Sequence, residues 1–287
     1  MAAETAGQLT LRKEFIDPLV KGFALKEYKL KPLCLIETSN AWQESFYKET
    51  AAELVGGTEE AVRGVPRLAA FPTGEVSWTK TMAYNEKFGM EASISWEDIH
   101  LNAISVITRT TLRIARAVTN AVDILIEAAI ADNAGNNLVI SNGYEWDSAT
   151  IANRDPVKDI LTAIQTIRAD NYDPLTNGYL VVNGTDYTNI ISNTKCVNSP
   201  TFKSADVVTN GRVGQICGLT IVVTESVTVS GAYVVIGKEA MTWKEAKPLN
   251  TIVIDDPGIK TTIRAFEVGC VQITNPDAIC KIRNTRA

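Results

Sequence analysis

The sequence predicts an α+β protein built around one long helix. The stretch from Trp96 to Asn133 contains neither proline nor glycine, the residues that interrupt helices. Period-two apolar patterns precede this stretch, and β-branched runs bounded by Gly, Asn and Asp follow it after Val213, as in strands. We find no sequence repeat and no low-complexity linker, so few clear boundaries divide the chain.

The long helix is predicted to be amphipathic. Apolar residues recur at alternating spacings of three and four and form one stripe, namely Ile104, Ile107, Thr111, Ile114, Val118, Ala121, Leu125 and Ala128. The opposite face is polar and carries Arg109, Arg113, Arg116, Asn120, Asp123 and Glu127. At 1.5 Å per residue the helix is roughly 50 Å long. A rod of that length suits a subunit of a thin, wide shell better than a compact enzyme.

The first 50 or so residues are predicted to form an extended arm followed by a short helix. Pro18 and Pro32 interrupt any long element. Aromatic and aliphatic residues are scattered among lysines, and such arms become ordered against a neighbour; these residues are Phe15, Phe23, Leu25, Tyr28 and Leu30. The stretch from Asn40 to Leu54 has a composition typical of a helix.

Between Gly56 and Ser95 the pattern predicts a β-hairpin. Alternate residues from Val76 to Tyr84 share one strand face, and alternate residues from Met90 to Trp96 share another. The turn between them is predicted over Asn85 to Gly89. A two-stranded hairpin is marginal in water, so we expect it to lie on another subunit if it projects from the body.

After the long helix the sequence predicts a mixed lobe. A loop over 135–153 precedes a second helix, with Asp155 as its N-cap and Pro156 in its first position, that runs to about Asp170. A strand follows over 178–183, and a short helix begins at Thr185 or Asp186. Further strands are predicted over 218–226, 231–238, 250–256, 261–273 and 278–284, with a helical turn over 239–246.

Composition restricts the class of protein. An apolar share of 45% allows a sizeable core, and a net charge of −5 argues against a dedicated nucleic-acid binder. Five cysteines without a CxxC pair, beside a single histidine, form no convincing zinc site and favour reduced buried thiols. The N-terminus does not resemble a signal peptide and no apolar run is long enough to cross a bilayer, so we expect a soluble protein made in a cytoplasm.

The sequence offers little for catalysis. Dinucleotide-binding, P-loop, nucleophile-elbow and HExxH motifs are absent. His100 could act as a general base or metal ligand, but no accompanying motif supports that role, so we favour a packed or solvated residue. The pair Glu97–Asp98 suits a helix N-terminus and Asp255–Asp256 suits a turn. We therefore predict a protein that is not an enzyme, with no catalytic residue, cofactor or metal.

The order of these pieces carries a resemblance. Residues 71–99 look like an extended loop, and 97–133 look like the spine helix of a peripheral domain. Asp155 to Ile190 looks like part of an axial domain, Gly218 to Val223 resembles the strand that follows (Thr220 stands where proline is common), and Arg264 to Ile282 resembles return strands. Along essentially the whole chain this order resembles the major capsid proteins of tailed double-stranded DNA viruses, the Hong Kong 97 fold.

The resemblance implies a domain organisation and a function. It divides the chain into an N-terminal arm (1–55), an extended loop (56–96), a peripheral domain with the spine helix (97–154), an axial domain (155–250) and return strands of the peripheral domain (251–287). The subunit is expected to form hexamers and pentamers of an icosahedral virion shell around double-stranded DNA. Implied partners are other copies of the chain, a portal and a decoration protein. Scaffolding is expected to come from a separate protein or from none. The resemblance also implies weak contact with DNA and no membrane.

The residues expected at subunit contacts lie in the arm, the hairpin and the helix: Phe15, Phe23, Tyr28, Trp78, Lys80, Tyr84, Lys87, Phe88, Arg109, Arg113 and Arg116. The three arginines allow two interpretations, a face toward nucleic acid or a solvated face that pairs with acidic groups. Some relatives crosslink a loop lysine to an asparagine. Lys80 and Lys87 could supply the lysine, but the corresponding turn, Asp255 to Gly258, lacks asparagine, so we expect no crosslink.

Two other classes remain open at this point. An encapsulin-like compartment shell shares the fold and would enclose enzyme cargo instead of a genome. An enzyme with a mixed α/β fold should show a cluster of titratable groups in a cleft, and the sequence gives no sign of one.

Overall fold

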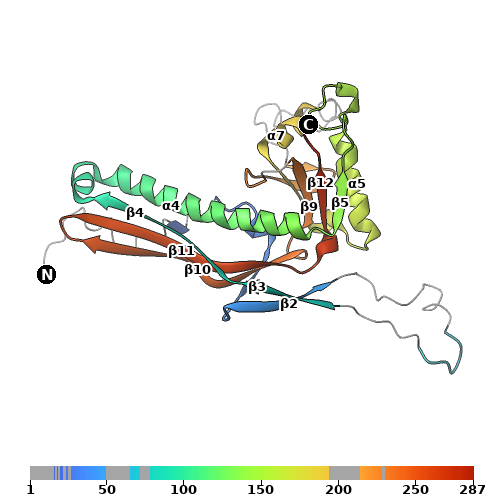
Figure 1. Ribbon diagram of the computed structural model, residues 1–287, viewed down its shortest axis with the longest axis horizontal. Coiled ribbons are helices and arrows are strands. Elements are labelled where there is room, and N and C mark those ends of the chain that lie inside the picture. The colour runs from blue at the N-terminus through green and yellow to red at the C-terminus, as the bar shows by residue number, and fades with distance from the viewer. Residues whose placement is uncertain are drawn as a thin grey trace.

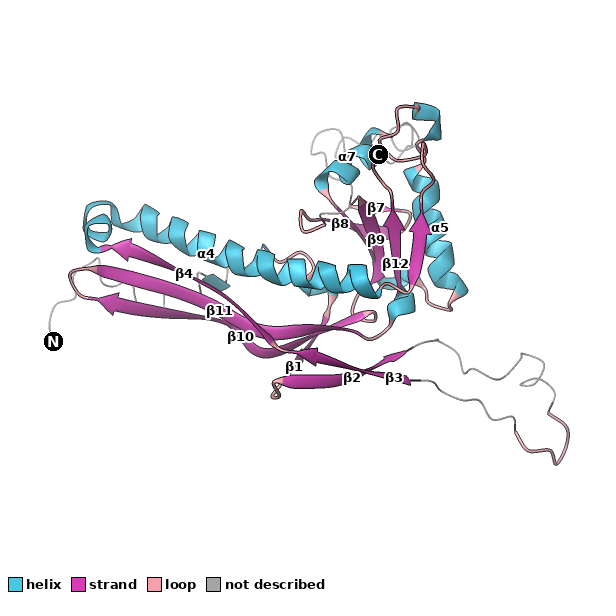
Figure 2. Cartoon of the chain, in the orientation of Figure 1, coloured by secondary structure: helices cyan, strands magenta, loops and turns pink. Residues whose placement is uncertain are grey.

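The computed structural model describes residues 16, 18, 20, 21, 24, 27–49, 65–71, 78–193, 214–227 and 230–287, without the side chains of 49, 78 and 100–105. Two lobes share one long helix, α4 (Trp96–Asn133) (Figure 1). An elongated lobe consists of α4 lying along a four-stranded sheet. An upright lobe contains a six-stranded sheet with its helices, and a two-stranded hairpin lies beyond the four-stranded sheet, on the side away from α4 (Figures 1 and 2).

The strand order of the four-stranded sheet is β1-β10-β11-β4. Its members are β1 (Leu35–Thr38), β10 (Met241–Asp256), β11 (Lys260–Ile273) and β4 (Glu86–Ser95). The two longest strands, β10 and β11, form an antiparallel ribbon whose register shifts on either side of Lys247. Pro248 lies within the second shift, where its missing N–H does not interrupt a regular ladder.

The strand order of the six-stranded sheet is β5-β12-β9-β6-β8-β7. Its strands are β5 (Asn136–Val139), β12 (Ile279–Arg283), β9 (Gly231–Ile236), β6 (Gly178–Val182), β8 (Leu219–Val223) and β7 (Gln215–Ile216). The lobe also contains α5 (Pro156–Ala169), α6 (Pro174–Asn177), α7 (Gly184–Ser192) and the short turns η2 (Ile151–Asn153) and η3 (Pro276–Ala278). Every residue of β9 is buried, which explains why its sequence is continuously apolar.

The helices begin where local sequence signals place them. The Ser95 hydroxyl accepts a hydrogen bond from the Asp98 backbone N–H at 3.2 Å and caps α4. Asp155 caps α5 in the same way through the Lys158 N–H, with Pro156 in the first turn. The sequence predictions for the long helix and for α5 are therefore confirmed.

The helix α4 contributes to two cores. Its first half packs Ile107, Ile114 and Val118 against Ile263 and Ala265 of β11. Its second half packs Val122, Ile126 and Ile130, all with no exposed side-chain surface, into the core around the six-stranded sheet. Burying each such side chain stabilises the fold by about 1.5–3 kcal/mol. The helix therefore ties the two lobes together.

The predicted polar face of the long helix is wrong at two positions. Asp123 and Glu127 are 3% and 7% exposed, whereas Ala128, predicted on the apolar stripe, is exposed. The second half of α4 lies between the two lobes and is covered on more than one side. The hydrogen bonds that its two carboxylates accept compensate for their burial. Asp123 accepts from backbone N–H groups, and Glu127 accepts from the Tyr233 hydroxyl at 2.7 Å.

The predicted hairpin pairing is also wrong. The strand β3 (Trp78–Tyr84) pairs with β2 (Gln43–Glu49), whereas β4 pairs with β11. Only Asn85 separates β3 from β4, and one residue is too short for the reversal that an antiparallel pair needs. The expected turn over Asn85 to Gly89 is therefore mostly strand.

Three further predictions need correction. The helix expected over 40–54 contains the strand β2, and the helical turn expected over 239–246 is largely the start of β10. The arm before Lys29 is not extended where it is described: Ile16, Val20 and Ala24 are helical and at most 1% exposed in the core beneath α4. Their spacing of four places them on one helix face.

Candidate intersubunit surface

The two faces of the β2–β3 hairpin differ in exposure. Residues directly opposite one another in an antiparallel pair lie on the same face. The register therefore places Gln43, Ser45, Tyr47, Lys80, Met82 and Tyr84 together, with Trp78 at the end of the same row. All six described side chains of this row are exposed. We call this row the open face.

Three of the six described side chains of the open face are large and aromatic or apolar. Tyr47, Met82 and Tyr84 are 56%, 55% and 59% exposed. Single exposed apolar residues are common, but a contiguous group on one strand pair marks an interaction site. A two-stranded sheet is also marginally stable alone and gains from a covering surface.

The reverse face of the hairpin is covered by its own subunit. Glu44, Phe46, Lys48, Thr81 and Ala83 are half-buried on this side. The Lys48 ammonium donates to the Asn133 side-chain oxygen at the end of α4, at 2.6 Å. The hairpin therefore rests on its own subunit with one face and leaves the other available.

The chain before the hairpin is held by a buried polar cluster. Asp123 of α4 accepts hydrogen bonds from the backbone N–H groups of Lys29, Leu30 and Lys31 at 2.8, 3.1 and 3.3 Å. Lys31 opens the turn η1 (Lys31–Leu33). We call residues 28–34 with Asp123 the anchor. It fixes the point at which the N-terminal part of the chain joins the body.

A second carboxylate completes the anchor. Glu267 of β11 has no exposed surface and receives hydrogen bonds from the Tyr28 hydroxyl and the Lys31 ammonium. Lys31 also pairs with Glu245 of β10 at 3.0 Å and lies 5.4 Å from the centroid of the Trp243 ring. The charges are paired, as burial requires, because an unpaired buried charge is strongly destabilising.

Burial determines the electrostatics of the anchor. It raises the pKa of the Asp123 carboxyl, although the three backbone N–H groups act in the opposite direction. Burial, with the negative charge of Glu267, raises the pKa of the Tyr28 hydroxyl, and burial raises the pKa of the Cys34 thiol to about 12. An uncharged thiol in such a place is a packing group and not a nucleophile.

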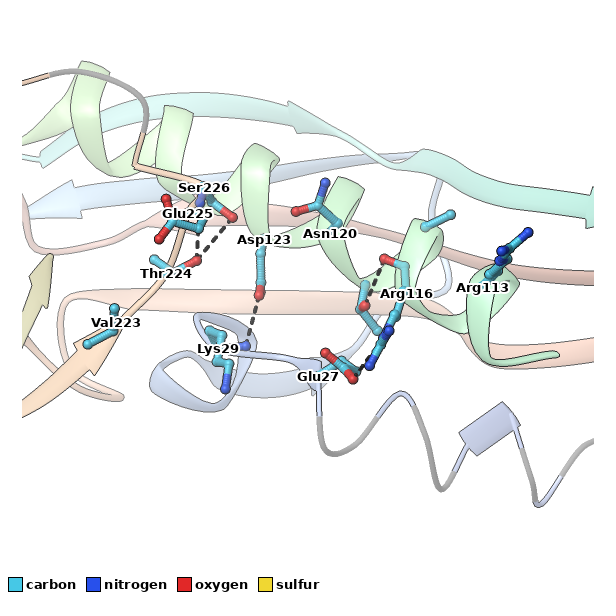
Figure 3. A pocket seen from close by; sticks show the side chains of 12 residues that line it. Glu27, Lys29, Arg113, Arg116, Asn120, Asp123, Val223, Thr224, Glu225 and Ser226 are labelled. Atoms are coloured by element: carbon cyan, nitrogen blue, oxygen red, sulfur yellow. Dashed lines mark hydrogen bonds and ion pairs between the residues drawn. The ribbon is translucent and has the colours of Figure 1, made fainter. Parts of the chain in front are cut away.

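An open groove of about 590 Å³ lies beside the anchor (Figure 3). The α4 side of the groove carries Arg113, Arg116 and Asn120, and the loop after β8 contributes Thr224 and Ser226. Arg116 pairs with Glu27 at 3.1 Å (Figure 3). Cationic and acidic side chains are balanced along its walls, so the groove has no strong preference for a polyanion.

The structure brings part of the predicted contact set together. Lys80 and Tyr84 lie on the open face, and the register assigns Trp78 to the same row. Lys87 is exposed, but it lies on β4, where its ammonium is 4.9 Å from the centroid of the Phe266 ring. Phe88 is half-buried and its ring centroid is 6.3 Å from that of Trp243.

The other predicted residues lie apart from the hairpin. Tyr28 belongs to the anchor, where it binds within its own subunit. Arg109, Arg113 and Arg116 are exposed on α4. Phe15 and Phe23, and the side chain of His100, lie outside the described residues.

Sequence reasoning missed Tyr47 and Met82 as contact candidates. Tyr47 was missed because its segment was predicted as a helix. Met82 was assigned to the same strand face as Trp78, Lys80 and Tyr84 but was not included among the contact candidates. The alternation of Gln43, Ser45 and Tyr47 with Glu44, Phe46 and Lys48 was a weak signal for the missing strand.

The described part of the chain shows no metal-binding arrangement. No group of three or more His, Cys, Asp or Glu side chains within it could hold a metal ion. None of its helices combines the length and the apolar character needed to span a membrane. The main features of the described residues are the exposed face of the hairpin and the buried polar cluster of the anchor.

Comparison with known proteins identifies the family. The family model described as phage capsid protein matches residues 79–282, from β3 to β12. The chain belongs to the phage capsid protein family. It is therefore a capsid shell subunit with a structural, non-enzymatic role. A sequence comparison with curated proteins gives no match.

Solved structures support the same fold. The capsid of the cyanophage P-SCSP1u is 13% identical with a TM-score of 0.67, over 88% of this chain and 87% of that one. A chain in the structure of Mycobacterium phage Che8 is 17% identical with a TM-score of 0.63, over 100% of this chain and 94% of that one. A virus-like particle from Pyrococcus furiosus is 11% identical with a TM-score of 0.64, over 94% and 98%. The fold is the tailed-phage major capsid fold that the sequence predicts.

Proposed function

We propose that this capsid subunit assembles as hexamers and pentamers into an icosahedral shell around double-stranded DNA, through the open face of the hairpin. The observation that carries the proposal is the open face itself. Its exposed Tyr47, Met82 and Tyr84 have no cover among the described residues of their own subunit. In a shell of identical copies, each such face meets a neighbour at every repeat of the symmetry.

The same proposal assigns each lobe to a domain of the capsid fold. The elongated lobe of α4 and the four-stranded sheet is the peripheral domain, and the lobe around the six-stranded sheet is the axial domain. On this assignment β10 (Met241–Asp256) belongs to the peripheral domain and β12 (Ile279–Arg283) to the axial domain. The ranges 155–250 and 251–287 expected from the sequence divide these strands differently.

The proposal includes partners beyond other copies of the chain. A scaffolding protein made separately, a portal and a decoration protein fit a shell of this fold. The enclosed DNA is contacted weakly and without sequence preference, in keeping with the net charge of −5 and the balanced groove beside α4. We place synthesis in the cytoplasm of the host. A compartment for enzyme cargo is not favoured, because the matching family is one of phage capsid proteins.

Electron microscopy of the concentrated protein tests the proposal, alone and with the scaffolding protein of its virus. We expect closed icosahedral particles built from rings of six and five. Particles from infected cells should protect DNA from nuclease, and empty assembled shells serve as the control. A uniform monomer under every condition, or closed particles that never contain DNA, would contradict the proposal.

A further inference from the structure

The hairpin joins the body at a small buried cluster. On one side, residues 39–42 connect β1 to β2. On the other side Asn85 alone connects β3 to β4, so the chain passes from one sheet to another across a single residue. Asn85 and Ser39 are only 2% and 3% exposed, although the hairpin beyond them is largely exposed.

The two connections are tied to each other by Asn85. Its side-chain amino group donates to the Ser39 hydroxyl at 3.0 Å and to the Ala41 carbonyl at 2.6 Å. Its backbone N–H donates to the Trp42 carbonyl at 3.1 Å. Because a carbonyl can only accept, the contact with Ala41 fixes which way the amide points.

Ser39 ties the same cluster to the body and to the hairpin. Its backbone N–H donates to the Glu245 carbonyl of β10 at 3.0 Å. Its hydroxyl lies 2.5 Å from a carboxylate oxygen of Glu44, the second residue of β2. We call Ser39, Ala41, Trp42, Glu44 and Asn85 the hinge cluster. It forms a continuous set of hydrogen bonds from the body sheet to the first residues of the hairpin.

Asn85 is held through its donors alone. Its side-chain oxygen is buried and accepts no hydrogen bond from the described residues. The two donors of the amide join the connection through Ser39 and Ala41 to the one through Asn85.

We infer that Asn85 is a positioning residue for shell assembly, fixing through Ser39 and Ala41 the angle at which the hairpin leaves the body. The inference rests on the proposed function, since that angle determines where the open face meets a second copy. Without the two bonds of the amide, the hairpin keeps its own pairing but samples a range of directions. Contacts that must close a shell then form at incorrect angles.

Two variants separate positioning from packing. Asn85→Asp keeps the size of the side chain but places an oxygen opposite the Ala41 carbonyl, and Asn85→Ala removes the side chain beyond Cβ. The control is Asn142→Ala, at an exposed position in the upright lobe. Because two hydrogen bonds of a buried amide are lost, we expect the yield of shells of the wild-type diameter to fall about tenfold in both hinge variants. The control should assemble normally.

A spectroscopic measurement on the unassembled subunit makes the test independent of shell formation. Spin labels at Thr79→Cys on the hairpin and Asn137→Cys on β5, with Cys196 and Cys217 replaced by serine, report one distance distribution. We expect it to broaden in Asn85→Ala and Asn85→Asp at temperatures well below their thermal midpoints, which should themselves fall by a few degrees because buried hydrogen bonds are lost. A distribution as narrow as that of the wild type in both folded variants overturns the inference. If the wild type never assembles, the proposed function fails, and the label distances still decide the role of Asn85.

Discussion

The anchor and the hairpin are neighbours in sequence but are completed in opposite ways. In the anchor, Asp123 and Glu267 are buried and receive hydrogen bonds from residues 28–31 of the same subunit. In the hairpin, the reverse face rests on the body while Tyr47, Met82 and Tyr84 stay exposed. The difference separates two kinds of residue: those that the subunit needs to fold and those that only an assembled shell covers.

Loss of the Asp123 carboxylate should have the largest effect on the stability of the subunit. Asp123→Ala leaves the backbone N–H groups of Lys29, Leu30 and Lys31 without their acceptor. Because unpaired buried donors are costly, we expect the free energy of unfolding to fall by about 3 kcal/mol. Urea unfolding of the unassembled subunit measures it. The control Asp132→Ala, at an exposed position on the same helix, should cost less than about 0.5 kcal/mol. Equal losses of unfolding free energy in the two variants would contradict the role of Asp123 in holding the anchor.

Tyr28→Phe should have an intermediate effect that depends on pH. Loss of the hydrogen bond to Glu267 should cost about 1–2 kcal/mol near neutral pH. The folded pKa of Tyr28 is raised, so the folded state keeps a proton that the unfolded state loses. That contribution is complete below the unfolded pKa of about 10 and is lost as the pH rises above it.

Unfolding curves at neutral and strongly alkaline pH check this sign. Wild type should lose more stability than Tyr28→Phe as the pH rises. A difference between the two proteins that stays constant or grows with pH would contradict the assignment. Because burial also raises the pKa of Tyr233, the pair Tyr233→Phe and Tyr28→Phe,Tyr233→Phe separates the two contributions.

Substitutions on the open face should leave subunit stability almost unchanged and reduce assembly. We expect Tyr84→Ala, and Trp78→Ala at the end of the same row, to change the free energy of unfolding by less than about 0.5 kcal/mol. Shell yield, measured by sedimentation, should fall because each lost contact is repeated around the shell. Thr79→Ala, exposed on the reverse face, is the control. Parallel loss of stability and assembly would remove the distinction between the two regions.

The last prediction concerns a covalent crosslink between subunits, which we expect to be absent. Lys80 lies on the open face, but the end of β10 and the turn after it read Asp255-Asp256-Pro257-Gly258 and offer no asparagine side chain. Denatured mature shells should therefore run as single chains in gel electrophoresis and mass spectrometry. Ladders of joined subunits would show that the hairpin makes a covalent contact.

Local signals in the sequence were sufficient where a single element decides its own structure. The caps Ser95 and Asp155 and the unbroken run from Trp96 to Asn133 define two helices without reference to neighbours. Pairing over long separations was not readable: β2 has a helical composition, and only its ladder with β3 makes it a strand. The burial of Asp123 was equally hidden, because its partners are backbone groups 92 to 94 residues away.

The helix α4 also determines how the chain can be cut. Domains normally separate where few contacts cross, but Ile114 belongs to one core and Ile126 to the other on the same uninterrupted helix. A fragment ending inside α4 would leave one core incomplete and expose an apolar stripe. The subunit is thus a poor candidate for dissection into halves.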